Sequence, residues 1–299
     1  MTTLVLPAWT TVAGGALALA PVLWFGFNSE RLQAWPSDRK AASSAIQLAL
    51  PALLCVPYTV VTAPLGMFHW KWFLLYAFLP VLIAGVLMLV TRLDPEQRGH
   101  WLEFVVLLTL GLTVDLRWFD NAWPRHLDAF NKILLLDAGL YAFLIIRRLT
   151  GVGFDLRLRR DDWKIGLREW AFYVPIALSL GLAVGFLHWH RHLERAWMAP
   201  LIWIGIFFVV ALPEEIFFRG WMLNLLERRL GRTAALIITS IVFGLAHFNK
   251  RTTSFNWRYV LLAAIAGIFY GRAWSKQRRS SASAITHASV DTIWGVLLR

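Results

Sequence analysis

Long apolar stretches recur along the whole chain, and short segments rich in charged residues separate them. We count about ten such stretches, most of them close to the roughly 17–25 residues that a helix needs to cross a bilayer. Because lipid offers the backbone no hydrogen-bond partner, each stretch is expected to be a helix. The fourth, fifth and ninth are short, so about eight to ten crossings are predicted. In chain order the stretches are Leu4–Phe27, Ala41–Val61, Trp72–Val90, Trp101–Leu116, Lys132–Ile146, Trp170–Leu187, Trp197–Phe218, Thr233–His247, Trp257–Gly271 and Ser281–Leu298.

The composition points the same way. Hydrophobic residues make up 58% of the 299 residues and charged residues only 16%, and the mean hydropathy is +0.56. Soluble domains carry about a quarter charged residues, so this chain lies outside their range. The sequence therefore predicts an all-α, polytopic transmembrane helix bundle, a multi-pass protein of the cell inner membrane.

The net charge of +12 could suggest a nucleic-acid partner, but the basic residues form short clusters between the apolar stretches. Basic residues in such positions typically face anionic lipid, and the 17 Trp residues suit the headgroup level. We therefore expect the lipid bilayer as their partner, and no nucleic acid. The densest basic block, Arg147–Arg168, is predicted to lie on the cytoplasmic side.

The same basic block marks the predicted boundary between two parts of the chain. Residues 1–150 hold N-terminal transmembrane helices of unknown role, and residues 161–299 hold every cluster that looks chemical. The segment Arg160–Leu167 is typical of the start of an amphipathic surface helix that is capped by an Asp.

Two other polar features are expected to be structural. Asp137 lies within the fifth predicted span and is expected to pair with a neighbouring helix. The alternating His188, His190 and His192 could suggest a metal site, but they lie between two spans among Trp and Arg residues. An interfacial turn is the favoured interpretation of that segment.

Ionisable side chains inside apolar spans are costly, so each one is a functional candidate. The first cluster consists of Glu214, Glu215 and Arg219. Glu215 and Arg219 are four residues apart, so they share a helix face and can pair. Glu214 lies about 100° further round the helix and is free to face another group. Taken alone, this cluster could also be an ordinary group of charges at a helix end.

Two later clusters can reach the same depth in the membrane. Phe243 and His247 end one predicted span, and His287 and Asp291 share a face of the last one. If the helices run antiparallel, Glu214 and His247 lie about 22 and 21 Å from the cytoplasmic ends of their helices, and His287 and Asp291 about 12 and 18 Å. The three helices are therefore predicted to present these side chains to one cleft.

The three motifs, EExxxR, FxxxH and HxxxD in this order, resemble the signature of the CPBP family (CAAX protease and bacteriocin-processing, or Abi, proteins), which includes Rce-type endopeptidases. The resemblance covers roughly Asp161–Arg299. It implies a glutamic intramembrane endopeptidase that acts on a membrane-anchored polypeptide. By position, Glu214 and His247 would polarise a water, His287 and Asp291 would stabilise the oxyanion, and Glu215, Arg219 and Phe243 would support them.

The sequence departs from the family at Asp291, where prenyl-protein members often have Asn. An ionised Asp donates no hydrogen bond, so Asp291 must be protonated, orient His287 or ligate a metal. Two His and a carboxylate could hold zinc with an open position. Since HExxH is absent, no metal cofactor is expected, and zinc is the alternative.

A non-catalytic CPBP-like membrane protein is the rival interpretation. It could be a bacteriocin immunity protein, a membrane scaffold or a small transporter. A transporter typically shows broken helices in two related halves, whereas all three motifs of this chain lie in one half. An immunity protein could keep the motifs without turnover.

Overall fold

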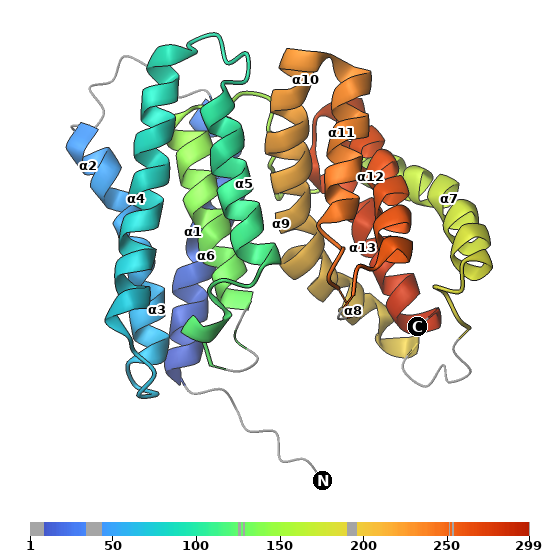
Figure 1. The fold of residues 1–299 in the computed structure, drawn as a ribbon, viewed down its shortest axis with the longest axis horizontal. Coiled ribbons are helices and arrows are strands. Elements are labelled where there is room, and N and C mark those ends of the chain that lie inside the picture. The colour runs from blue at the N-terminus through green and yellow to red at the C-terminus, as the bar shows by residue number, and fades with distance from the viewer. Residues whose placement is uncertain are drawn as a thin grey trace. The chain divides into compact units, whose positions relative to one another are not determined.

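The computed structural model describes residues 9–33, 44–124, 127, 129–189, 196–250, 252 and 254–298. All regular secondary structure in these residues is helical, without a strand (Figure 1), which confirms the predicted all-α fold. The chain divides into two compact units, Met1–Thr150 and Gly151–Arg299. Each unit is described by itself below.

The N-terminal unit is a helical bundle. In it α1 packs against α3 and α6, and α4 packs against η1, α3, α5, α6 and η3. All five apolar stretches predicted here are helical where the structure describes them. Its helices are α1 Trp9–Gln33, α2 Ser44–Ala49, η1 Leu50–Leu54, α3 Cys55–Thr62, α4 Trp70–Leu93, α5 Trp101–Asp115, η2 Asp120–Ala122, α6 Ala129–Leu140 and η3 Tyr141–Ile146.

A buried arginine closes one end of this unit. Arg147 follows η3, and its guanidinium donates to Glu103 Oε1 at 2.6 Å and to Asp94 Oδ2 at 2.9 Å. Two carboxylates therefore compensate one buried cation, which ties the end of α4 to the start of α5. Nothing in this cluster faces a cavity, and its role is structural.

Asp137, on α6, does not pair with a neighbouring helix as expected. It is buried, and neither carboxylate oxygen has a hydrogen-bond partner among the described residues. The sequence shows a carboxylate within an apolar span, but helix packing decides which side chains face it.

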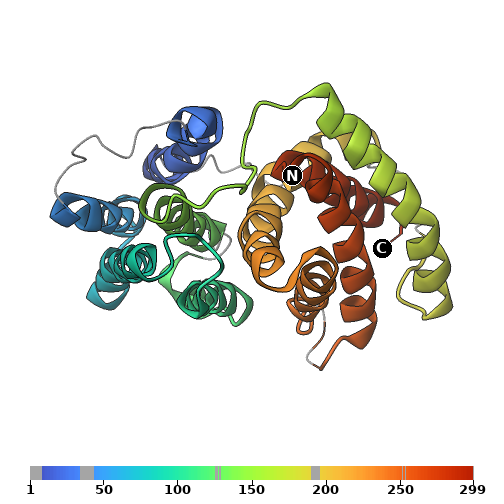
Figure 2. The same ribbon diagram turned by 90° about the horizontal axis from the view of Figure 1, so that it is seen from above.

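In the C-terminal unit, α13 is the central helix. It packs against α7, α12 and the segment from α8 to α9, as Figure 2 shows from above. The helices of this unit are α7 Arg160–Ala183, η4 Ala196–Met198, α8 Ala199–Ile206, η5 Phe207–Ala211, α9 Leu212–Glu215, η6 Ile216–Leu223, α10 Asn224–Leu230, α11 Arg232–Leu245, α12 Trp257–Gln277 and α13 Ser280–Leu297.

The structure corrects the prediction for Arg160–Leu167. This segment is the first part of α7, a continuous helix of 24 residues, and its N-cap is Arg159 rather than an Asp. Asp162 instead accepts a hydrogen bond from the Arg159 backbone N–H at 2.8 Å, and its side chain is fully buried against Arg279. The sequence shows an Asp near the start of this helix, but its role as N-cap or as partner of Arg279 depends on how the helices pack.

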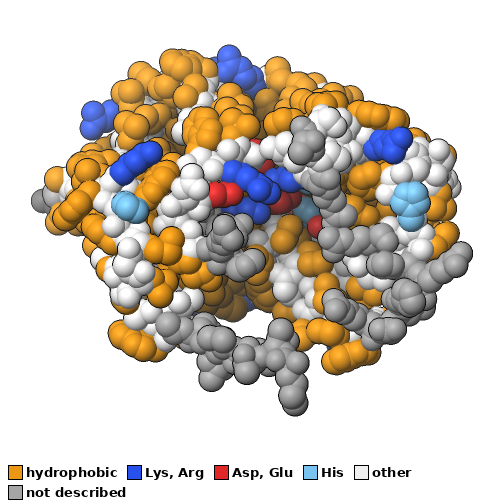
Figure 3. Space-filling model, turned by 60° about the horizontal axis from the view of Figure 1, so that its bottom comes forward, with side chains coloured by type: hydrophobic (Ala, Val, Ile, Leu, Met, Phe, Trp, Pro, Cys, Tyr) orange, Lys and Arg blue, Asp and Glu red, His pale blue; other side chains and the backbone are white. Residues whose placement is uncertain are grey.

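The described residues contain five helical stretches that are long and apolar enough to cross a membrane: Trp9–Ser29, Ala45–Thr62, Trp70–Leu93, Ala129–Ile146 and Ala196–Leu230. The other predicted spans are helical too, but α5 and α11 have only 15 and 14 residues. Large hydrophobic side chains such as Phe78, Leu82 and Leu201 are exposed, and such side chains cover much of the face in Figure 3. The chain is a multi-pass membrane protein.

Candidate active site

Both glutamates of the first motif lie in α9, a single α-helical turn between the π-wound segments η5 and η6. Pro213 precedes them and has no N–H, so it cannot donate to the carbonyl of Val209 as a helical residue would. The wider winding begins directly before it, in η5. Segments of π-helix often mark functional sites, because they re-aim the side chains that follow.

Glu215 and Arg219 form a fully buried ion pair. Arg219 donates from Nη1 to Glu215 Oε1 at 2.8 Å and from Nη2 to the carbonyl oxygen of Gly267 at 3.0 Å. The pairing expected from their spacing is thus present. Phe243 covers the guanidinium, whose central carbon lies 4.6 Å from the centre of the Phe243 ring.

His287 lies at the meeting point of three carboxylates. Its Nδ1 is 2.9 Å from Glu215 Oε1, and since a carboxylate paired with arginine only accepts, Nδ1 carries a proton and donates. Its Nε2 faces the other way, 3.6 Å from Asp291 Oδ2 and 3.9 Å from Glu214 Oε2. The side chains of Glu214 and Asp291 are 32% and 27% exposed, whereas Glu215 is fully buried.

His247 follows the end of α11, and its ring contacts a backbone carbonyl oxygen and an aromatic ring. Its Nδ1 is 2.8 Å from the carbonyl oxygen of Phe243, which can only accept, so Nδ1 donates here as well. In the neutral imidazole, Nε2 is therefore an acceptor. The ring lies 4.7 Å from that of Tyr259, centre to centre.

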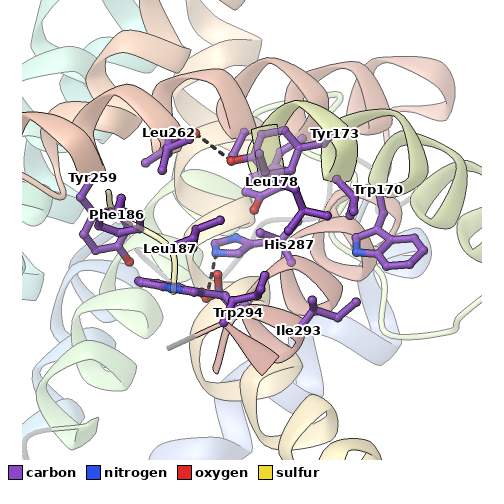
Figure 4. Close-up of a pocket in the computed structure, with 18 of the residues that line it drawn as sticks. Trp170, Tyr173, Leu178, Phe186, Leu187, Tyr259, Leu262, His287, Ile293 and Trp294 are labelled. Carbon is purple, nitrogen blue, oxygen red and sulfur yellow. Dashed lines mark hydrogen bonds and ion pairs between the residues drawn. The ribbon is translucent and has the colours of Figure 1, made fainter. Parts of the chain in front are cut away.

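A pocket lies beside these groups within the C-terminal unit. Four of the seven predicted residues line it: Phe243, His247, His287 and Asp291. Glu214, Glu215 and Arg219 do not line it, and Glu214 Oε2 lies 3.9 Å from Nε2 of the lining residue His287. In Figure 4, His287 lies between Tyr259 and Phe186 on one side and Trp170 on the other.

Most of the pocket wall is apolar. The aliphatic and aromatic lining residues come from α7, the turn after it, α12 and the end of α13, and they are Val174, Ala177, Leu178, Phe186, Leu187, Leu262, Ala263, Ala266, Val290, Ile293, Trp294 and Leu298. The exceptions are His247, His287 and Asp291 and the hydroxyl groups of Tyr173, Tyr259 and Tyr270. Such an arrangement suits an apolar substrate group held beside a polar reacting centre.

The comparison with protein families gives a match in this part of the chain. Residues 195–293 match the family described as type II CAAX prenyl endopeptidase Rce1-like. The similarity to this family covers about one third of the chain. The match includes all seven predicted residues and begins after α7, so it is shorter than the resemblance over roughly Asp161–Arg299. The chain matches no curated protein and no solved structure.

The family match supports an intramembrane protease of the CAAX type that acts on polypeptides. No group of three or more His, Cys, Asp or Glu side chains among the described residues is arranged to hold a metal ion. His190 and His192 lie outside the described residues. The backbone N–H of His188 donates to the carbonyl oxygen of Leu298 at 3.3 Å.

Two residues beside the candidate site, Ser283 and Tyr270, were not predicted from the sequence. The Ser283 hydroxyl contacts Glu215 Oε2 and also reaches the carbonyl oxygen of Tyr270 at 2.9 Å. The Tyr270 ring stacks on His287, with ring centres 4.6 Å apart and an interplanar angle of 18°. One signal was available: Ser283, His287 and Asp291 recur at intervals of four residues and so share a helix face.

Proposed function

We propose that the C-terminal unit is a glutamic endopeptidase of the inner membrane, which hydrolyses a peptide bond of a membrane-anchored polypeptide with a water activated by Glu214 and His247. One observation carries the proposal. Glu214 Oε2 has no hydrogen-bond partner among the described residues and lies 3.9 Å from His287 Nε2, beside an apolar pocket that His247 also lines.

Glu214 is better suited than Glu215 to accept a proton from water. Both oxygens of Glu215 are occupied, one by Arg219 and His287 and the other by Ser283, and the side chain is fully buried. The side chain of Glu214 is about one-third exposed, and its Oε2 is buried without a hydrogen-bond partner among the described residues. A general base must lie within hydrogen-bond reach of the proton that it removes.

In the proposed reaction, Glu214 takes one proton from the water while the water oxygen adds to the scissile carbonyl carbon. His247 accepts a hydrogen bond from the same water at Nε2, since its Nδ1 donates to the Phe243 carbonyl. The C–N bond then breaks, and Glu214 returns the proton to the leaving amine. A positioned general base of this kind typically contributes about 10²–10⁴-fold.

His287 is the proposed oxyanion donor, through Nε2–H of the imidazolium. Of the three roles open to Asp291, its distance of 3.6 Å from Nε2 favours orienting His287 and balancing its charge. No step of this reaction uses a metal. A zinc ion would have to draw its ligands from the same histidines and carboxylates.

The test compares two Glu→Gln variants in purified protein, reconstituted in lipid with a panel of membrane-anchored peptides. Glu214→Gln removes the base, and Glu96→Gln alters an exposed glutamate of the N-terminal unit that pairs with Arg98. Wild type and Glu96→Gln should cleave equally, and Glu214→Gln should lose about 10²-fold or more. Equal product from all three refutes the proposed base. No product from any of them favours the rival, a non-catalytic immunity protein, scaffold or transporter.

A further inference from the structure

We propose that Ser283 is a positioning residue for His287: through Glu215 it fixes the orientation of the imidazole ring. Its effect on turnover rests on the proposed function, while its effect on the ring orientation does not. Ser283 is fully buried on α13, one turn before His287, and belongs to none of the three motifs.

The orientation of His287 depends mainly on one hydrogen bond. Tyr270 stacks on one face of the ring, and the Phe243 ring stands at 88° to it. These contacts hold the plane of the ring, but they are nearly unchanged when the ring is turned over. Glu215 and Asp291 distinguish the two orientations, and the contact with Glu215 is the closer one. Nδ1 lies 2.9 Å from Glu215 Oε1, and Nε2 lies 3.6 Å from Asp291 Oδ2.

A flip of the ring would exchange the functional atoms. Nε2 now faces Asp291 and Glu214, at 3.6 and 3.9 Å. After a half-turn about the terminal side-chain torsion, ring carbons would take the places of the nitrogens. The site would then lose its donor toward the reacting carbonyl group, so the carboxylate of Glu215 has to be held in one rotation.

Ser283 provides that hold. The terminal torsion of a Glu side chain is broad and roughly two-fold, so it does not fix the carboxylate by itself. Arg219 and His287 both meet Oε1, and Ser283 contacts Oε2. The same hydroxyl lies 2.9 Å from the Tyr270 carbonyl oxygen on α12, and its one hydrogen is shared between the two acceptors. The contacts thus run from α12 through Ser283 and Glu215 to His287.

The chain offers a matched control. Ser281 is also fully buried on α13, and its hydroxyl donates to a backbone carbonyl oxygen, that of Asp155. Ser281→Ala and Ser283→Ala each leave a buried acceptor without a donor, so both should destabilise the protein to a similar extent. Only Ser283→Ala removes a contact of Glu215.

The test measures turnover and ring orientation together in the full-length protein. Ser283→Ala should lower kcat per folded molecule by about 10–100-fold with little change in KM, as loss of a supporting partner typically does. Ser281→Ala should keep the wild-type kcat. In ¹⁵N spectra of histidine-labelled protein, with His287→Gln for assignment, His287 should give one set of signals in wild type and Ser281→Ala, and additional signals from the turned ring in Ser283→Ala.

Equal kcat and unchanged ¹⁵N spectra in both alanine variants overturn the inference, even if cleavage itself depends on Glu214. If the wild type cleaves nothing, the proposed function fails, and the spectra alone decide the role of Ser283. A shift in the His287 signals that Ser283→Ala causes and Ser281→Ala does not would then still support it.

Discussion

Arg279 and Asp162 form a two-point contact, from Nε to Oδ1 at 2.7 Å and from Nη2 to Oδ2 at 2.9 Å, across 117 positions of the sequence. Asp155 accepts from Nη1 of the same guanidinium at 2.9 Å. The contact joins the start of α7 to the start of α13, the helix that carries His287. It therefore fixes where one wall of the pocket stands relative to the proposed reacting groups.

Removing one partner of this contact should destabilise the C-terminal unit. Asp162→Asn leaves the buried guanidinium with Asp155 as its remaining carboxylate, and breaking a buried pair typically costs about 3–5 kcal/mol. Thermal unfolding of the purified protein measures the loss. The neighbouring Asp161→Asn is the control, since Asp161 is exposed and pairs with Lys164 only at 3.5 Å. Equal stability of the two variants would contradict the structural role of Asp162.

Glu215 should matter for stability as well as for activity, in contrast to Glu214. Glu215→Gln leaves Arg219 buried without its counter-charge, which typically costs about 3–5 kcal/mol. Glu214 is partly exposed and makes no ion pair with Arg219. Unfolding temperatures should therefore fall for Glu215→Gln and stay near wild type for Glu214→Gln. A fall of the same size in both would mean that Glu214 is also structural.

Replacing Asp291 with Asn should reduce activity less than replacing it with Ala. Asn keeps an acceptor oxygen that can face His287 Nε2, and it is the residue often found here in the family that this chain resembles. We expect Asp291→Asn to retain activity within about 10-fold of wild type and Asp291→Ala to lose about 10²-fold. Steady-state cleavage of one peptide substrate gives both ratios. If Asn proves as damaging as Ala, the negative charge itself is required.

Gly166 should not accept a methyl group. A Cβ on Gly166 would lie 2.7 Å from Ile285 Cγ2 and 2.8 Å from the carbonyl oxygen of Ala282, where α7 crosses α13. Gly166→Ala should lower the free energy of unfolding by about 1–3 kcal/mol through overpacking. Gly205, on α8, has nothing within 4 Å, so Gly205→Ala should leave stability equal or slightly higher. If Gly166→Ala proves more stable than Gly205→Ala, α7 and α13 can move apart to make room for the methyl group.

Chelators separate the glutamic reaction from a zinc reaction. We expect dialysis against a strong chelator to leave peptide cleavage unchanged, because the proposed chemistry uses only Glu214, His247 and His287. Metal analysis of the dialysed protein is the control for complete removal. Loss of activity that added zinc restores would replace the proposed mechanism with the metal alternative.

The sequence by itself determined the helical fold and the elements of the site. An unpaired backbone N–H or C=O group is too costly in lipid, so long apolar stretches have to be helices. The described residues confirm this helical fold. Helical spacing also anticipated the pair of Glu215 with Arg219 and the shared face of His287 and Asp291, because both are contacts within one helix.

Only the tertiary structure decided the contacts between helices. That Glu215 meets His287 across 72 positions, that Ser283 stands behind it, and that Asp162 faces Arg279 rather than solvent all follow from how the helices pack. Helix packing also leaves Asp137 without a hydrogen-bond partner among the described residues, although the sequence predicted a pair with a neighbouring helix. Periodicity fixes the face of a helix on which a side chain lies. The neighbour at that face depends on the rotation and depth of a second helix, which no local pattern encodes.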